Sequence, residues 1–448
     1  MHQEGQETQG QETQGQAQVK AETDSAAARS VLLLALLTWL LLAVTYSGAV
    51  NPNSGIRGMD FNVFYQAATR LNHGAPLYQP GVPHVLPYVY SPLPALLMRP
   101  LGRLPFEAAL KAWFFVNAGC LILAVLLYGA AARLIWRNAS LLGILLLVSF
   151  RFWDNTLNFG IGQSNDVLLA LIGGMLWADS RGRWGLLGAL IVLAALFKVW
   201  MIALLLYLLL RRRWKPALLS AGGFALSLGL LFSVTGWHEL PAFVQVLRSA
   251  KAIQETMEVQ NSIIGVANTH LRANPFVTPL LNSGVIYSAF IALGVVVVLW
   301  GFTFLWRILQ APSPLEARLA FGLTLASILL LLPTYENGYF VYCFPLLWTL
   351  LASPEADVVT PARLLSPSRL MLAGGVLIYL VFSRPWPFYT PFAPAYQHGF
   401  KSLLVSMKFF GTAALWLVGM AALHGLRRVK ADASEPERVL PAVPLRAQ

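Results

Sequence analysis

The chain has 448 residues, of which 57% are hydrophobic and 12% are charged, and its net charge is +12. Soluble domains carry about 25% charged and about 45–50% apolar residues, so this composition excludes an ordinary soluble protein and indicates a polytopic integral membrane protein. The Lys and Arg residues stand in short clusters between apolar runs. The positive-inside rule explains this pattern, which lacks the single basic face expected of a nucleic-acid-binding protein.

Polar segments flank the apolar part of the chain. Residues 1–29 repeat a Gln-Glu-Thr-Gln-Gly unit and contain almost no apolar side chains, which predicts a disordered cytoplasmic tail. Residues 30–430 form the predicted membrane domain, and residues 431–448 a second disordered cytoplasmic tail.

A helix needs about 20 apolar residues to cross a bilayer, and the chain offers about twelve candidate spans. The clear ones are 31–50, 108–132, 216–235, 284–306 and 402–426; shorter ones are 319–332, 339–351 and 370–382, and four compact ones are 140–153, 166–177, 184–197 and 200–210. An even number of spans with both termini cytoplasmic places every basic cluster on the cytoplasmic side. The sequence therefore predicts an all-α membrane protein whose long loops, 51–107 and 236–283, lie on the extracytoplasmic side.

The four compact segments are too short to cross a membrane alone. A helix of about 13 residues is roughly 20 Å long, against a hydrocarbon core of about 30 Å. We interpret the segments as two hairpins whose tips, 158–165 and Lys198, lie at membrane depth; two long spans, each broken once, are the alternative. Non-helical backbone at that depth lines a cavity or packs inside protein.

Asp60 is the carboxylate nearest to the mouth of the first span, and few other acidic residues reach the same side. It either caps the helix expected from residue 61 onward or acts as a functional base, and the residues alone leave both open. Within 158–165, Gln163 and Asn165 offer amide donors and acceptors, although a polar turn between two helices has the same composition. Lys198 interrupts an apolar run, so its ammonium faces an anion or a cavity, or else extends to the outer headgroups.

Several common sites are missing from the sequence. It has no Asp-x-Asp motif for metal-bound nucleotide sugars, no glycine-rich Lys-Ser/Thr phosphate loop and no His/Cys set at metal-ligand spacing. Cys120 and Cys343 both lie in apolar segments and are interpreted as buried hydrophobes. The sequence therefore predicts neither a metal nor a cofactor.

The order of the remaining motifs resembles glycosyltransferase family 87, whose members are polytopic GT-C enzymes that use polyprenyl-phosphate sugars. The resemblance begins with Asp60-Phe61, Val63-Phe64-Tyr65, Ala67-Ala68, Gly74 and Leu77-Tyr78. It continues through Tyr88-Val89-Tyr90, Gly162-Gln163, Asn165, Lys198 and the turn Gln260-Asn261-Ser262.

The resemblance implies an inverting transfer of a sugar, mannose first, from a polyprenyl-phosphate donor to a lipid or glycan hydroxyl at the extracytoplasmic face. Asp60 matches the family's catalytic Asp, and Lys198 matches a lysine near the donor, where Gln163 and Asn165 are further candidates. The candidate sugar or acceptor contacts are Tyr65, Tyr78, Tyr90, Asn261 and Glu336.

This sequence departs from the family's pattern at two places. The family usually has a proline soon after the lysine, whereas Lys198 is followed by Val199 and Trp200. The late outer loop often carries a Trp-x-His element, and here Glu336 or Tyr339 stands in that region.

Three other functions stay open at this point. A lipid-linked sugar flippase or secondary transporter would have inverted repeats, and no convincing internal symmetry is visible. A scaffold without activity would not depend on Asp60 or Lys198. Within the enzymes, an arabinofuranosyltransferase is the alternative to a mannosyltransferase.

Overall fold

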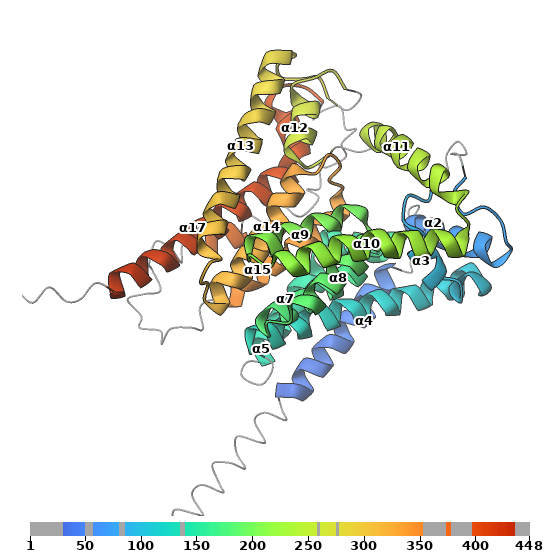
Figure 1. Cartoon of the computed structure of the whole chain (residues 1–448), viewed down its shortest axis with the longest axis horizontal. Helices are drawn as coiled ribbons and strands as arrows, with labels where there is room; N and C mark the ends of the chain where they lie inside the picture. The colour runs from blue at the N-terminus through green and yellow to red at the C-terminus, as the bar shows by residue number, and fades with distance from the viewer. Residues whose placement is uncertain are drawn as a thin grey trace, which may run out of the picture. The chain divides into compact units, whose positions relative to one another are not determined.

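The computed structural model describes residues 30–49, 57–79, 86–134, 139–257, 260–274, 277–352, 373–377 and 397–434. Every regular element within these ranges is a helix, which confirms the predicted all-α class (Figure 1). The predicted tail at 1–29, most of the predicted span 370–382 and the residues after 434 lie outside the described ranges.

Six helices of the described part are long and apolar enough to cross a membrane: Ser30–Ala49, Phe106–Ala132, Trp214–Thr235, Gly284–Ile308, Pro314–Leu331 and Gly399–Arg428. A seventh results if Ala139–Arg151 and Trp153–Ile161, bent by 59°, form one span. Trp184–Phe197, Val199–Leu210 and Gly338–Ala352 are apolar but shorter. The protein is therefore an integral membrane protein, and the larger predicted count of about twelve includes these short segments.

The chain divides into two compact units, Met1–Ile202 with Leu219–Ala250, and Ala203–Leu218 with Lys251–Gln448. In the first unit, α4 (Phe106–Ala132) packs along α7 (Asn165–Ser180), which packs on α8 (Trp184–Phe197) (Figure 1). Before α7 the chain forms α5 (Ala139–Arg151) and α6 (Trp153–Ile161). The turn between α6 and α7 and the end of α8 at Lys198 lie within the predicted hairpin tips, but residues 158–161 of the first tip are helical and belong to α6.

The first unit also contains α2 (Met59–Asn72), α3 (Pro92–Leu97) and η1 (Leu101–Arg103). Its second stretch of chain, Leu219–Ala250, covers most of α10 (Trp214–Thr235) and the first part of α11 (Glu239–Met257). α2 is amphipathic because its apolar residues recur at helical spacing, and it buries Phe61, Phe64, Ala67 and Ala68. These side chains join an aromatic core that also contains Tyr78, Tyr88 and Trp113.

Ser91 connects the ends of two helices in the first unit. Its side chain caps α3 by accepting a hydrogen bond from the Leu93 amide, as N-cap serines do. The same hydroxyl donates to the carbonyl oxygen of Leu196, in the last turn of α8. Carbonyl groups in the last turn of a helix lack a partner within the helix. The Ser91 hydroxyl, in the loop after α2, therefore supplies a hydrogen-bond donor to the C-terminal end of α8, beside Lys198.

The second unit contains α9 (Leu205–Leu210), α12 (Ile263–His270), α13 (Gly284–Ile308), α14 (Pro314–Leu331), η3 (Asn337–Cys343), α15 (Phe344–Ala352), η7 (Gly399–Ser406) and α17 (Met407–Ser434). α14 is apolar on all sides and almost wholly buried, packing against α13, α15 and α17 (Figure 1). A helix that is hydrophobic all round belongs in an interior, so α14 forms the centre of this unit.

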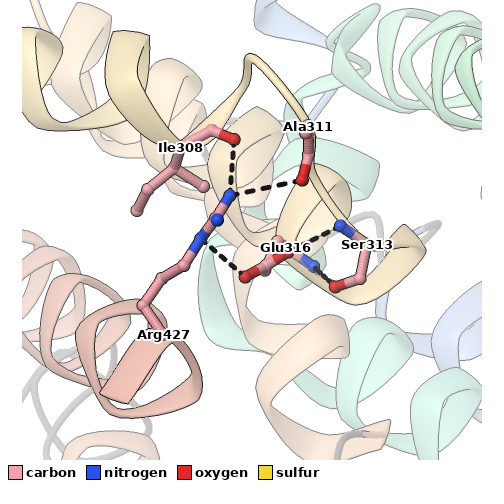
Figure 2. Close-up of polar contacts among 5 residues, drawn as sticks. All are labelled: Ile308, Ala311, Ser313, Glu316 and Arg427. Carbon is pink, nitrogen blue, oxygen red and sulfur yellow. Dashed lines mark hydrogen bonds and ion pairs between the residues drawn. The ribbon is translucent and has the colours of Figure 1, made fainter. Parts of the chain in front are cut away.

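An ion pair fastens α17 to the turn before α14. Figure 2 shows the guanidinium of Arg427, whose Nε lies 2.9 Å from Oε1 of Glu316 and whose Nη2 donates to the Ile308 carbonyl oxygen at 2.7 Å. The other carboxylate oxygen of Glu316 accepts from the Ser313 amide at 2.6 Å and completes a capping box. The buried Glu316 carboxylate therefore caps the N-terminus of α14 and also forms an ion pair with α17.

Candidate active site

Asp60 lies in the first turn of α2, in the first unit. The N-cap of this helix is Gly58, whose φ of 65° suits glycine, and its amide donates to the Gly160 carbonyl oxygen at 2.8 Å. The alternative in which Asp60 caps the helix is therefore wrong, because Gly58 occupies that position. The Asp60 carboxylate instead accepts a hydrogen bond from Nε2 of Gln163 at 2.6 Å.

The Gln163 side chain is held at both ends. Its Oε1 accepts from the Ser164 amide at 3.2 Å while its Nε2 donates to Asp60. The Gln163 amide in turn donates to the Asn158 carbonyl oxygen at 2.9 Å, which closes α6. The amide group is thus fixed with its donor toward the carboxylate.

Gly162 allows the turn to reach α2. Its φ is 73°, a left-handed conformation, and a Cβ added there would come within 2.5 Å of the Cβ of Phe61. The indole Nε1 of Trp113, on α4, donates to the Gly162 carbonyl oxygen at 2.8 Å. The turn is therefore clamped between α2 and α4, and it lines a small pocket with residues Ala49, Leu110, Trp113, Phe114, Asn117 and Phe159.

Lys198 is buried inside the first unit, with 5% of its surface exposed. Its Nζ donates to Oδ1 of Asn165 at 2.8 Å, and Nδ2 of Asn165 donates to Oδ1 of Asn158 at 3.1 Å. The alternative in which Lys198 extends to the outer headgroups is therefore wrong. The buried amides orient the ammonium as buried polar groups require.

The electrostatics connect Asp60 and Lys198. Burial raises the pKa of the Asp60 carboxyl above its ordinary value, while the hydrogen bond from Gln163 and the positive charge of Lys198 lower that pKa in part. A carboxylate with a raised pKa is suited to taking a proton from a hydroxyl. A buried cation near it can bind an anionic group beside that hydroxyl.

The predicted tyrosines occupy different environments. Tyr65 donates from its hydroxyl to the Leu104 carbonyl oxygen at 2.8 Å. Tyr78 is buried: its hydroxyl donates to the Tyr90 carbonyl oxygen at 2.7 Å, and its ring packs 5.2 Å from that of Phe243, between ring centroids. Tyr90 is partly buried, with its ring 4.5 Å from that of Phe64. The ring of Tyr78 thus lies among other aromatic rings in the interior.

Asn261 and Glu336 belong to the second unit. The amide and the Nδ2 of Asn261 both donate to the Tyr335 carbonyl oxygen, at 3.0 and 3.3 Å, and the Tyr335 amide donates to Oε1 of Gln260 at 2.6 Å. Glu336 is the N-cap of η3 and is partly buried. Two of the motifs singled out in the sequence, the Gln260-Asn261-Ser262 turn and the Tyr335 segment, are therefore joined to each other.

Two further residues make contacts that were not predicted: Trp113 at the turn beside Asp60, and Glu239 at the loop after α2. Trp113 stands in an apolar helix where nothing distinguishes a hydrogen-bonding indole from a packing one. Glu239 is buried and binds the backbone of the loop after α2, although its position resembles any acidic residue at the start of an amphipathic helix. No sequence signal would have found either contact.

Comparison with known proteins identifies the family of the chain. The glycosyltransferase family 87 profile matches residues 88–333, which include Gln163, Asn165 and Lys198 and begin after Asp60. A polyprenol-phosphate-mannose-dependent alpha-(1-2)-phosphatidylinositol pentamannoside mannosyltransferase of Mycobacterium tuberculosis (strain CDC 1551 / Oshkosh) is 27% identical over 372 residues, 80% of this chain and 78% of the relative.

Two relatives come from Mycolicibacterium smegmatis (strain ATCC 700084 / mc(2)155). The protein of the same name is 28% identical, over 79% of this chain and 82% of the relative. An alpha-(1->3)-arabinofuranosyltransferase is 24% identical, over 74% of this chain and 75% of the relative. Because the family profile covers more than half of the chain, this protein belongs to glycosyltransferase family 87 and is a membrane glycosyltransferase.

Proposed function

We propose that this enzyme transfers mannose from a polyprenyl-phosphate donor to a hydroxyl of a phosphatidylinositol-mannoside-like acceptor, with inversion and with Asp60 as general base. The observation that carries the proposal is the hydrogen bond from Gln163 to Asp60, because Asn165, two residues after Gln163, accepts a hydrogen bond from the buried Lys198. The names of the two mannosyltransferase relatives support the donor and the acceptor.

The proposed reaction begins at the acceptor hydroxyl. The Asp60 carboxylate takes its proton while the oxygen attacks the anomeric carbon on the face opposite the phosphate. The bond between that carbon and the phosphate oxygen breaks, and the polyprenyl phosphate leaves with the electron pair. General-base assistance of this kind typically contributes about 10²–10⁴-fold.

Lys198 is proposed to stabilise the leaving phosphate. Its buried ammonium is pre-oriented by Asn165 and needs no rearrangement as negative charge develops on the phosphate oxygen. The raised pKa of Asp60 suits the same step, because a more basic carboxylate accepts the hydroxyl proton more readily.

The proposed location of the reaction is the extracytoplasmic face, with both termini cytoplasmic. The alternation of basic clusters supports this topology, since Lys and Arg accumulate in cytoplasmic loops. The second outer loop, 236–283, is proposed to shape the acceptor site, and Tyr65, Tyr90, Asn261 and Glu336 are proposed as secondary contacts.

The test is transfer by Asp60→Asn in proteoliposomes supplied with polyprenyl-phosphate mannose and a phosphatidylinositol mannoside. We expect a loss of at least about 10²-fold in kcat. Glu107→Gln is the matched control, because Glu107 is an exposed acid in the first turn of α4 that pairs with Arg57. Near-normal turnover by Asp60→Asn would overturn the base role, and movement of labelled donor without bond formation would favour a flippase.

Lys198→Met and a second donor complete the test. Lys198→Met keeps most of the length of the unbranched side chain without its charge, and we expect it to lower kcat/KM for the donor by about 10²–10³-fold. Polyprenyl-phosphate arabinofuranose, added in the same assay, tests the sugar. Preferential transfer of arabinofuranose would replace mannose in the proposal, as the arabinofuranosyltransferase relative allows.

A further inference from the structure

Glu239, the first residue of α11, places its carboxylate on the backbone of the loop that follows α2. Its Oε1 accepts from the Leu77 amide at 2.7 Å, and its Oε2 accepts from the Tyr78 amide at 3.2 Å. Only 3% of the residue is exposed, so the charge is buried together with the two amides. Charge-assisted hydrogen bonds of this kind are roughly twice as strong as neutral ones.

Other charged and aromatic groups lie around Glu239 and the loop that it binds. Nε2 of the adjacent His238 lies 3.6 Å from Oε1 of Glu239. Arg70, in the last turn of α2, is attracted to the Glu239 charge. The ring of Tyr78 packs 5.2 Å from Phe243 of α11 and 6.4 Å from Phe232 of α10, between ring centroids. Leu77-Tyr78, a segment of the family-like motif with no role in the proposed chemistry, is thus the point where the first outer loop meets the second.

The catalytic end of α2 is fixed without Glu239. α2 has 14 residues, and at 1.5 Å per residue they place its two ends about 20 Å apart. The Asp60 end is held by the bonds from Gly58 to Gly160 and from Gln163 to Asp60. Glu239 therefore acts on the far end of α2 and on the loop, away from the reacting atoms.

The exposed face of α11 suggests what this arrangement recognises. Val244 and Leu247 are exposed apolar residues on this helix, and Arg248 beside them is an exposed cation. An apolar surface next to a positive charge complements the acyl chains and the phosphate of a phospholipid-anchored acceptor.

We infer that Glu239 is a positioning residue that fixes α11 against Leu77-Tyr78, and that this contact sets the recognition of a phospholipid-anchored acceptor. The inference deepens the proposed function and rests on it for the identity of the substrates. According to this inference, the position of α11 in the second outer loop depends on the buried carboxylate of Glu239.

The kinetic test compares Glu239→Ala with Glu239→Gln in the proteoliposome assay. We expect Glu239→Ala to raise the acceptor KM by about tenfold, equivalent to about 1.4 kcal/mol of lost binding. The donor KM, kcat and the pH profile should be unchanged, because Asp60 and Lys198 keep their contacts. Glu239→Gln should recover part of the loss, since its one carbonyl oxygen still accepts from an amide, and Ser233→Ala on exposed α10 surface is the control.

Phe243→Ala tests whether Glu239 acts through α11. Residues that hold the same contact couple, so the double variant should raise the acceptor KM by less than the product of the two single effects. An unchanged acceptor KM in Glu239→Ala, or a fall in kcat alone, would overturn the inference. If Glu239→Ala does not fold, Glu239→Gln and Phe243→Ala carry the same comparison.

Hydrogen exchange separates this inference from the proposed function, because it needs no substrate. In Glu239→Ala, the amides of Leu77 and Tyr78 should exchange faster, while those of α2 near Asp60 keep their protection. Unchanged exchange at Leu77 and Tyr78 would overturn the positioning role. An active Asp60→Asn enzyme would instead overturn the base role and leave this measurement untouched.

Discussion

Gln163 donates from its Nε2 to Oδ2 of Asp60 at 2.6 Å, a contact between residues 103 positions apart in the chain. Because Oε1 of the same side chain is occupied by the Ser164 amide, the donor cannot rotate away without breaking a second hydrogen bond. One amide therefore both orients the carboxylate and lowers its pKa against the effect of burial.

Replacing Gln163 should move the pH dependence of the reaction. Gln163→Leu removes a hydrogen bond that lowers the pKa of Asp60, so that pKa should rise further. Asp60 is active as the carboxylate, and a higher pKa means that the carboxylate forms only at higher pH. The acid limb of the kcat/KM profile should therefore shift to higher pH, with a lower maximum.

Gln66→Leu is the matched control for this measurement. Gln66 is an exposed residue of α2 whose side chain contacts only the nearby Asn62 among the hydrogen bonds described. Its replacement should leave the acid limb in place. If the pH profile of Gln163→Leu is the same as that of the parent enzyme, the ionisation seen in the acid limb does not belong to Asp60.

Adding a methyl group at Gly162 should disrupt the site. Gly162→Ala places a Cβ within 2.5 Å of Phe61 at a φ of 73°, and the strained backbone costs about 1–3 kcal/mol. The turn must then withdraw from α2, which lengthens the bond between Gln163 and Asp60 and lowers kcat. Gly160→Ala is the control, because a Cβ at that helical position meets nothing within 4 Å. Equal activities in the two variants would contradict the clamped turn.

Arg427 should contribute to stability and not to catalysis. Arg427→Met leaves Glu316 buried without its cation (Figure 2). Breaking a fully buried pair costs about 3–5 kcal/mol, and the partial exposure of Arg427 reduces this to about 2 kcal/mol. The variant should lower the Tm in detergent while kcat of the folded enzyme is kept. The exposed neighbour Arg428→Met should leave the Tm unchanged.

His270 should make stability fall in mild acid. Burial lowers its pKa from 6.5 to about 4, while Nε2 contacts the Ser406 hydroxyl at 2.9 Å. Between these two values the unfolded chain binds a proton that the folded chain does not, so this contribution is full above pH 6.5 and is lost as pH falls. Between pH 7 and pH 5 the loss is about 2 kcal/mol. His270→Asn should show a smaller drop in Tm over that range, and equal drops would contradict the assignment.

The sequence predicts the helical membrane architecture well, because hydropathy depends on composition within one segment. It also places Asp60, Gln163 and Lys198 at the ends of helices, since glycines and polar residues interrupt apolar runs there. It does not predict that Tyr78 is buried or that Glu239 binds Leu77. Those contacts use backbone amides and ring faces far apart in the chain, and no local pattern encodes which loop covers which helix end.

The shared hydroxyl of Ser91 means that the segment 57–107 cannot be exchanged independently of α8. If residues 57–107 were replaced by the corresponding loop of another family member, the incoming loop would have to bring its own donor for the Leu196 carbonyl oxygen. Without one, the last turn of α8 would have an unsatisfied acceptor beside the lysine that it presents. Chimeras made to alter acceptor choice should therefore be joined so that Ser91 and Leu196 come from the same parent.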